Sequence, residues 1–143
     1  IKNLQEWKRL RDAIFKNNLA KGAVINSPNG INKKAILDNK YDTYWTTKDK
    51  DTSATIVLTL KNKSSFNVLM LQEDIAIGQR IENLIFEYWN GKQWKNIIEG
   101  TTVGYKRLWQ FPNVTTNKVR LKIISSRLNP TLSEMGLYLQ AAK

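Results

Sequence analysis

The sequence predicts an all-β protein, an antiparallel β-sandwich of jelly-roll type, preceded by one N-terminal amphipathic helix. Apolar residues alternate with polar ones in several short segments from residue 55 onward, which is typical of half-buried strands. An Asn90-Gly91 pair separates two aromatic-rich segments, and Asn-Gly is a strong hairpin signal. No helical pattern interrupts the strands, which argues against a parallel sheet and favours a sandwich.

The first eighteen residues carry a different pattern from the rest. Their apolar side chains fall on one face of a helix, and Lys and Arg occupy the other face. The apolar stripe consists of Leu4, Trp7, Leu10, Ile14 and Phe15. We expect residues 1–18 to be either the last helix of a preceding domain or a linker docked on the β-domain, which then spans residues 19–143.

Seven segments carry the strand pattern, and each has its own signal. The first alternates strictly, the second alternates more loosely, and the third and fourth flank the Asn-Gly turn. The last three are short apolar runs separated by polar residues, a spacing that indicates antiparallel neighbours. The segments are 55–60, 66–71, 81–89, 93–98, 106–111, 118–124 and 135–139.

Composition narrows the possible chemistry. A chain of 143 residues makes one domain of ordinary size. It contains no Cys and no His, which excludes disulfides, zinc thiolates and Ser-His or Cys-His nucleophile pairs. No apolar run approaches the roughly twenty residues of a membrane span. The chain begins at Ile1 without Met, and we interpret it as an excised or processed piece of a longer protein.

The net charge of +11, from 23 basic and 12 acidic residues, has two interpretations. It could attract a polyanion, such as nucleic acid, anionic lipid or an acidic glycan. It could also serve solubility, since the Lys residues are scattered and no run of five basic residues occurs. The scattering favours solubility, so we do not expect nucleic acid or a membrane as the partner.

Two segments far apart in the sequence offer oxygen ligands at loop spacing. Asp38 and Glu134 supply charge, and Thr43 supplies a hydroxyl. Backbone carbonyls nearby could complete the six or so oxygen contacts that Ca²⁺ takes. The alternative from chemistry alone is an ordinary Asp/Asn turn with a solvated glutamate.

The order Asp38, Thr43, Trp45, answered by Ser133-Glu134, resembles the discoidin family. These are the coagulation factor V/VIII type C domains, which include the family 32 carbohydrate-binding modules. Asn39 stands where the family usually has Gly, and Asn tolerates the left-handed backbone. The resemblance implies a structural calcium held by Ala35, Asp38, Lys40, Thr43, Ser133 and Glu134.

Residues 68–81, 100–108 and 129–138 resemble the C-terminal domain of bacterial α-L-fucosidases of glycoside hydrolase family 29. Residues 15–23 resemble the exit from that family's catalytic barrel. The resemblance implies that an upstream catalytic domain carries the nucleophile and the acid, and that this chain has no catalytic residues. It also implies a secreted or periplasmic bacterial protein.

Sugar binding requires an aromatic ring that stacks on the sugar and a few polar groups that fix its hydroxyls. The His that family 32 modules usually place there is absent. The candidates that remain are Glu73, Arg80, Tyr105, Trp109, Arg127 and Asn129. Trp109 could instead pack in the core, and Arg127 and Asn129 could instead stabilise their loop.

Two acid pairs, Asp49 with Asp51 and Glu73 with Asp74, raise the question of catalysis. Retaining glycosidases need two carboxyl groups about 5 Å apart across the sugar. The first pair lies in a polar stretch that is typical of a solvated loop. The second ends a strand, where it could orient Arg80 or meet a neighbouring domain.

Three classes of function therefore compete, in this order. The first is a carbohydrate-binding or accessory module of an α-L-fucosidase. The second is a purely structural appendage that supports the catalytic domain. The third is a module that binds anionic membranes through Ile75 and Ile77, although the adjacent Glu73 and Asp74 would repel anionic lipid.

Overall fold

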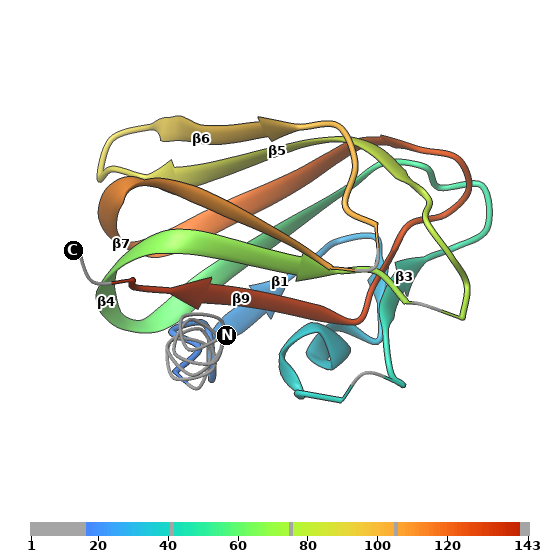
Figure 1. Ribbon diagram of the computed structural model, residues 1–143, viewed down its shortest axis with the longest axis horizontal. Coiled ribbons are helices and arrows are strands. Elements are labelled where there is room, and N and C mark those ends of the chain that lie inside the picture. Colours follow the sequence, from blue (N-terminus) through green and yellow to red (C-terminus); the bar gives the residue numbers. More distant parts are fainter. Residues whose placement is uncertain (1–16, 41, 75, 105, 141–143) are drawn as a thin grey trace, which may run out of the picture.

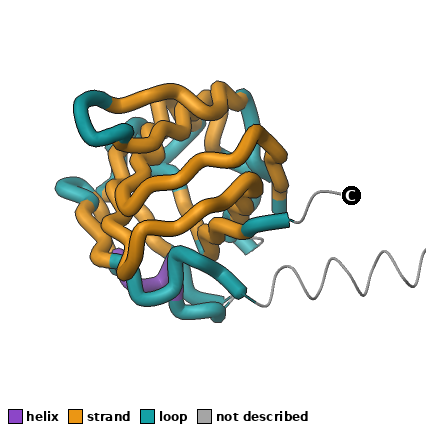
Figure 2. Tube along the Cα trace, turned by 90° about the vertical axis from the view of Figure 1, so that its left-hand side faces the viewer, coloured by secondary structure: helices purple, strands orange, loops and turns teal. Residues whose placement is uncertain are grey.

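A computed structural model describes residues 17–40, 42–74, 76–104 and 106–140. Within these ranges one short 3-10 helix, η1 (Lys33–Leu37), accompanies nine strands. Figures 1 and 2 show that strands make up most of the fold. The strands are β1 (Val24–Asn26), β2 (Gly30–Ile31), β3 (Trp45–Thr47), β4 (Ala54–Gln72), β5 (Ile81–Trp89), β6 (Trp94–Gly100), β7 (Arg107–Ser126), β8 (Thr131–Leu132) and β9 (Glu134–Tyr138). The helix expected over residues 1–18 falls almost entirely outside the described residues.

The strands form two antiparallel sheets. The larger has the order β1-β4-β7-β5-β6, with β9 also paired to β4. The smaller has the order β2-β3-β8. Every strand pair in the described part of the chain is antiparallel, which confirms the predicted antiparallel all-β class.

Two long strands, β4 and β7, give the larger sheet its shape. The sequence predicts two separate strands at 55–60 and 66–71, but β4 is continuous across both, with a register shift between Thr59 and Ser64. Pairing resumes there because β7 bends alongside, and the Ser65 and Thr115 hydroxyl oxygens lie 2.6 Å apart.

The bend divides the larger sheet into two layers. In the first layer, the start of β4 and the end of β7 pair with each other between β1 and β5. In the second, the end of β4 lies between β9 and the start of β7. The segments predicted as four separate strands are therefore two strands that run through both layers.

The predicted Asn-Gly hairpin is confirmed, because β5 and β6 pair on either side of it. The turn is a four-residue loop in which the Asn90 side-chain oxygen accepts N–H bonds from Lys92 and Gln93, both at 2.8 Å. Gly91 has a φ of 100°, which a residue without a Cβ adopts at little cost.

The hydrophobic core lies between the two layers. Trp45, Phe66 and Phe86 are fully buried in it, and burial of a side chain of this size stabilises the fold by roughly 1.5–3 kcal/mol. The Trp45 indole N–H donates to the Ser27 hydroxyl at 3.1 Å. A Cβ at Gly30 would collide with both of these side chains, so the β2 strand requires glycine there.

The small sheet lies at one end of the molecule. Figure 1 shows β3 at the opposite end from the bends of β4 and β7. Loops 73–80 and 127–130 meet at the β3 end, since Arg127 N donates to Arg80 O at 2.8 Å. Among the described residues, no helix combines the length and the hydropathy needed to cross a membrane.

Gly136 in β9 provides a test of the packing on this strand. A Cβ at this position would come within 2.6 Å of the Tyr138 ring, so Gly136→Ala should destabilise the protein by about 1–3 kcal/mol through overpacking. Urea unfolding measures the change. In a Tyr138→Leu background the same substitution should cost much less, since the ring is gone; an equal cost in both backgrounds would contradict this explanation.

Candidate functional site

Loop 73–80 is held by two buried carboxylates. The Glu73 side chain accepts N–H bonds from Arg80 at 2.8 Å, Ile81 at 3.0 Å and Gly104 at 3.0 Å. Asp74 accepts from Ala76 at 2.9 Å and Ile77 at 3.1 Å. Glu73 is 1% exposed, so its carboxylate faces the backbone and not a ligand. This position fits the alternative in which Glu73 orients Arg80. It does not fit direct contact between Glu73 and a sugar.

Arg80 and Asn129 meet at the β3 end of the molecule. Arg80 Nη1 donates to the side-chain oxygen and to the backbone oxygen of Asn129, both at 3.0 Å. The Asn129 amide donates in turn to Thr46 Oγ1 at 3.0 Å and to Thr47 O at 2.9 Å. Three segments distant in sequence are thereby joined in one hydrogen-bond network.

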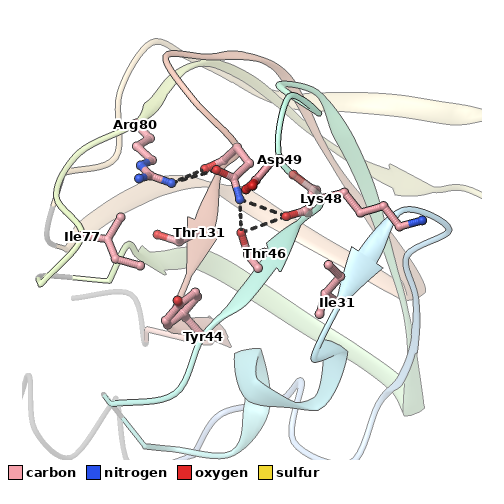
Figure 3. Close-up of a pocket in the computed structure, with 10 residues that line it drawn as sticks. Ile31, Tyr44, Thr46, Lys48, Asp49, Ile77, Arg80 and Thr131 are labelled. Atoms are coloured by element: carbon pink, nitrogen blue, oxygen red, sulfur yellow. Dashed lines mark hydrogen bonds between the residues drawn. The ribbon is translucent and has the colours of Figure 1, made fainter.

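This network forms part of the wall of an open pocket of about 410 Å³, a size typical of small-molecule sites. Figure 3 shows Tyr44, Ile77 and Arg80 around it. Tyr44, Ile31 and Ile77 contribute apolar surface, and the charged and amide groups contribute polar surface. The lining residues are Ile31, Tyr44, Thr46, Thr47, Lys48, Asp49, Ile77, Arg80, Asn129 and Thr131.

Of the six predicted sugar contacts, Arg80 and Asn129 line this pocket. Arg127 is exposed beside it, and its N–H bond to Arg80 O comes from the backbone. Trp109 is half-buried and packs against the main core, with the Arg107 guanidinium 4.9 Å from its ring centroid. Trp109 thus packs against the core, which is the alternative to sugar contact that the sequence left open. Tyr105 lies outside the described residues.

The sequence interpretation missed the β3 side of the pocket. Tyr44 precedes the buried Trp45, and residues 46–49 read Thr-Thr-Lys-Asp. The polar residues in that run resemble a solvated loop, which is how we interpreted them. An aromatic residue next to a buried Trp was the available signal, because alternation turns one of two neighbouring strand residues outward.

The predicted cation loop is a tight turn around the Asp38 carboxylate. One carboxylate oxygen accepts the Lys40 N–H at 2.9 Å, and the other accepts the Thr43 hydroxyl at 2.6 Å. The Thr43 hydroxyl also lies 3.3 Å from Lys40 O. Asn39 has a φ of 59°, which confirms the expected left-handed backbone at this position.

Glu134 faces this turn from the C-terminal segment. Burial raises the pKa of Glu134 to about 7, and the negative charge of Asp38 adds to the rise, whereas N–H groups of Met135 and Asn39 oppose it. The fold therefore brings the two predicted halves together. Across the described ranges no group of three or more Asp or Glu side chains is placed so that it could hold a metal ion. A cation at this position would depend on two carboxylates and on neutral oxygens.

Glu73 tests how the site loops are held. Glu73→Ala would leave three N–H groups without their acceptor, and each buried orphan costs about 1–3 kcal/mol. We expect a loss of at least about 3 kcal/mol in urea unfolding, with Glu73→Gln milder because it retains one acceptor oxygen. Wild-type stability in Glu73→Ala would contradict the structural role.

The same residue predicts a pH effect. Burial raises the pKa of Glu73 above its ordinary value of 4.5, although three backbone N–H groups oppose the rise. The folded protein then binds this proton more tightly than the unfolded chain does. As the pH is lowered toward 4.5, the free energy of unfolding of the unsubstituted chain should rise relative to that of Glu73→Gln. Parallel urea titrations of the two proteins measure the difference. A stability difference that does not change with pH would contradict the shift.

Comparison with known proteins identifies the chain's relatives. The F5/8 type C domain family model matches residues 21–135. "Alpha-L-fucosidase 1" of Arabidopsis thaliana is 34% identical over 149 residues, which cover 97% of this chain and 29% of that protein. The chain therefore spans less than a third of the length of this relative.

Solved structures agree with the family match. A putative α-L-fucosidase from Bacteroides thetaiotaomicron superimposes with a TM-score of 0.89 at 30% identity, over 94% of this chain and 31% of that one. CpGH89CBM32-5 from Clostridium perfringens, solved with GalNAc-β-1,3-galactose, has a TM-score of 0.75 at 17% identity over 85% of this chain and 99% of its own. The second likeness shows the fold alone. The chain belongs to the F5/8 type C (discoidin) domain family.

Proposed function

We propose that this chain is the accessory carbohydrate-binding module of an α-L-fucosidase and that it binds terminal sugars weakly in the Arg80–Asn129 pocket. The observation that carries the proposal is the network joining Arg80, Asn129 and Thr46 beside Tyr44. Polar groups already held in position next to an aromatic ring are what a sugar site requires. The relatives named as fucosidases support the catalytic context.

The pocket chemistry suits a small neutral sugar. Two hydrogen bonds to Asn129 fix the orientation of the Arg80 guanidinium, which carries five N–H donors in a rigid plane. Asp49 can accept from sugar hydroxyls, and Tyr44 or Ile77 can cover an apolar sugar face. An open surface pocket that covers one residue of a glycan yields weak binding. Catalysis is assigned to the domain upstream.

The alternative is a structural appendage that supports the catalytic domain. The buried Glu73 and Asp74, both bonded to backbone N–H groups, favour a rigid loop and are compatible with either function. A membrane-binding role receives less support, because Ile77 is only half-exposed and lines the pocket. The secreted or periplasmic location remains a prediction from the family resemblance.

Calcium is the second element of the proposal. Asp38 and Glu134 would supply the charge, Thr43 a hydroxyl oxygen, and Ala35, Lys40 and Ser133 carbonyl oxygens. These are hard oxygen donors of the kind Ca²⁺ prefers. A bound cation would also offset the electrostatic repulsion between the Asp38 and Glu134 carboxylates. The ion would join the turn after η1 to the start of β9 and so stabilise the fold.

The sugar proposal predicts a specific loss of binding. Tyr44→Ala should weaken the affinity for the bound sugar at least about tenfold, since it removes the stacking surface. Arg80→Ala should abolish measurable binding. Calorimetric titration with fucose, galactose and fucosylated oligosaccharides measures both. Arg127→Ala is the matched control, being a neighbouring arginine that does not line the pocket; no binding of any of these sugars by the folded parent would refute the proposal.

The calcium proposal predicts a chelator-sensitive stability. At 100-fold excess over its Kd, an ion that binds only the folded state adds about 2.7 kcal/mol. Asp38→Asn and Glu134→Gln should remove the difference between thermal melts with calcium and with chelator. Glu82→Gln, at an exposed position of β5, should retain it. A parent protein that melts identically in calcium and chelator would show the assignment to be wrong.

A further inference from the structure

Another pocket lies between the loop before β2 and the paired ends of β4 and β7. Its volume is about 400 Å³, close to the 410 Å³ of the Arg80–Asn129 pocket and within the range of small-molecule sites. The lining residues are Pro28, Asn29, Ser53, Ala54, Thr55, Lys122, Ile123 and Ile124. We call it the Lys122 pocket.

One loop separates the two pockets. Asp49 lines the Arg80–Asn129 pocket, whereas Ser53, at the other end of the same loop, lines the Lys122 pocket. Side chains hold the backbone of this loop, since Asn29 Nδ2 donates to Ser53 O at 2.8 Å and Ser126 Oγ donates to Thr52 O at 3.1 Å. The Lys122 pocket is therefore preformed, and it shares no lining residue with the other pocket.

Lys122 gives this pocket a positive charge. Among the described residues in the pocket wall it alone is charged, and its side chain is 35% exposed. Its amine lies 3.8 Å from Glu87 Oε1, but Arg120 bonds to the same oxygen at 2.8 Å and is the closer partner of that carboxylate. An ammonium group has three N–H donors, so the loose contact with Glu87 leaves donors for an anion in the pocket.

The rest of the wall combines neutral polar groups with an apolar surface. Thr55 is directly opposite Lys122 in the pairing of β4 with β7, so a hydroxyl lies beside the ammonium group. Asn29 donates through its amide nitrogen to Ser53 O and retains its amide oxygen as an acceptor. Ile124 is 49% exposed and supplies the apolar surface. A few polar groups beside an apolar surface are typical of sites for small polar ligands.

We propose that the Lys122 pocket is a second carbohydrate site and that it binds an acidic sugar, one that bears a carboxylate or a sulfate group. Lys122 pairs with the anionic group, Thr55 and Asn29 bond to sugar hydroxyls, and Ile124 covers an apolar face of the ring. That the anion belongs to a sugar rests on the proposed function. A nucleic acid fits less well, because its binding draws on several phosphate contacts and this pocket holds one cation.

Three sugars that differ only at carbon 6 test the need for an anion. Galacturonic acid and galactose 6-sulfate are the acidic probes, and galactose is their neutral counterpart. Calorimetric titrations use the Arg80→Ala variant, in which the other pocket does not bind. At least one acidic probe should bind at least about tenfold more tightly than galactose, through a charge-assisted hydrogen bond. Its affinity should fall as the salt concentration rises. Affinities for both acidic probes no higher than for galactose would overturn the proposal.

A matched pair of lysine variants tests the position of the site. Adding Lys122→Ala to the Arg80→Ala variant should weaken the acidic probe at least about tenfold. Lys118→Ala is the control and should leave the affinity unchanged, because Lys118 is also a half-exposed lysine of β7 but does not line the pocket. No loss in Lys122→Ala, or an equal loss in both variants, would overturn the proposal.

Ile124→Glu provides a second, independent test. It places a carboxylate at the pocket wall and should abolish binding of the acidic probe by repulsion, with the affinity for galactose changed far less. Circular dichroism establishes that each variant retains the fold. Tighter binding of a single-stranded oligonucleotide than of either acidic sugar, lost in Lys122→Ala, would show a nucleic-acid site and overturn the proposal.

The two pockets can be tested separately. Fucose titration of Lys122→Ala reports on the Arg80–Asn129 pocket, and titration of Arg80→Ala with the acidic probes reports on the Lys122 pocket. Binding of an acidic probe by a folded chain that binds no neutral sugar would refute the proposed neutral-sugar site and retain the acidic one. Fucose binding by a chain that binds neither acidic probe would do the opposite.

Discussion

The pairing of β4 with β7 is the constraint on which the rest of the structure depends. This ladder runs from Ala54 to Leu71, and at the bend its register shifts between Thr59 and Ser64 before the two strands pair again. The bend places Ile56 and Leu58 in one layer and Leu69 and Leu71 in the other, so one pair of strands supplies both walls of the core. The remaining strands of the larger sheet attach to one half or the other. A polar stretch such as residues 61–65 costs little at the bend, because the Ser65 hydroxyl bonds to Thr115 across the ladder and the Ser64 hydroxyl donates to Asn62 O.

Buried polar groups then hold the loops at the β3 end. Isolated carboxylates are expensive to bury, and Glu73 offsets that cost with three backbone N–H bonds from two separate loops. Asn129 joins Arg80 to β3 in the same manner. Among the described residues, every buried side-chain nitrogen or oxygen has a hydrogen-bond partner. The pocket is therefore built on a rigid end of the molecule, so a ligand in the proposed sugar site would need to order few protein groups on binding.

The module separates its tasks in space. The pocket lies at one end, and the Asp38–Glu134 pair lies where the turn after η1 meets β9. On the outer face of the first layer, Glu87 is bonded to Arg120 at 2.8 Å, and that guanidinium lies 4.3 Å from the Trp94 ring centroid. These contacts cover part of Trp94 and pair the arginine within the sheet. Solubility as the role of the basic charge stays a prediction.

Sequence alone determined the strand class and the hairpin, and it paired the Asp38 turn with Glu134, which the fold brings together. Alternation and Asn-Gly are local signals, and Asn39 adopts the left-handed backbone that its type permits. Arg80 and Asn129, which line the pocket, were also among the sequence candidates; their contact with a sugar stays a prediction. Only the tertiary structure decided that four predicted strands are two, that Glu73 is buried, that Trp109 packs on the core, and that Tyr44 and Thr46 complete the pocket. Each of these depends on contacts between residues distant in the chain, and local propensity does not contain the partner that a side chain will meet.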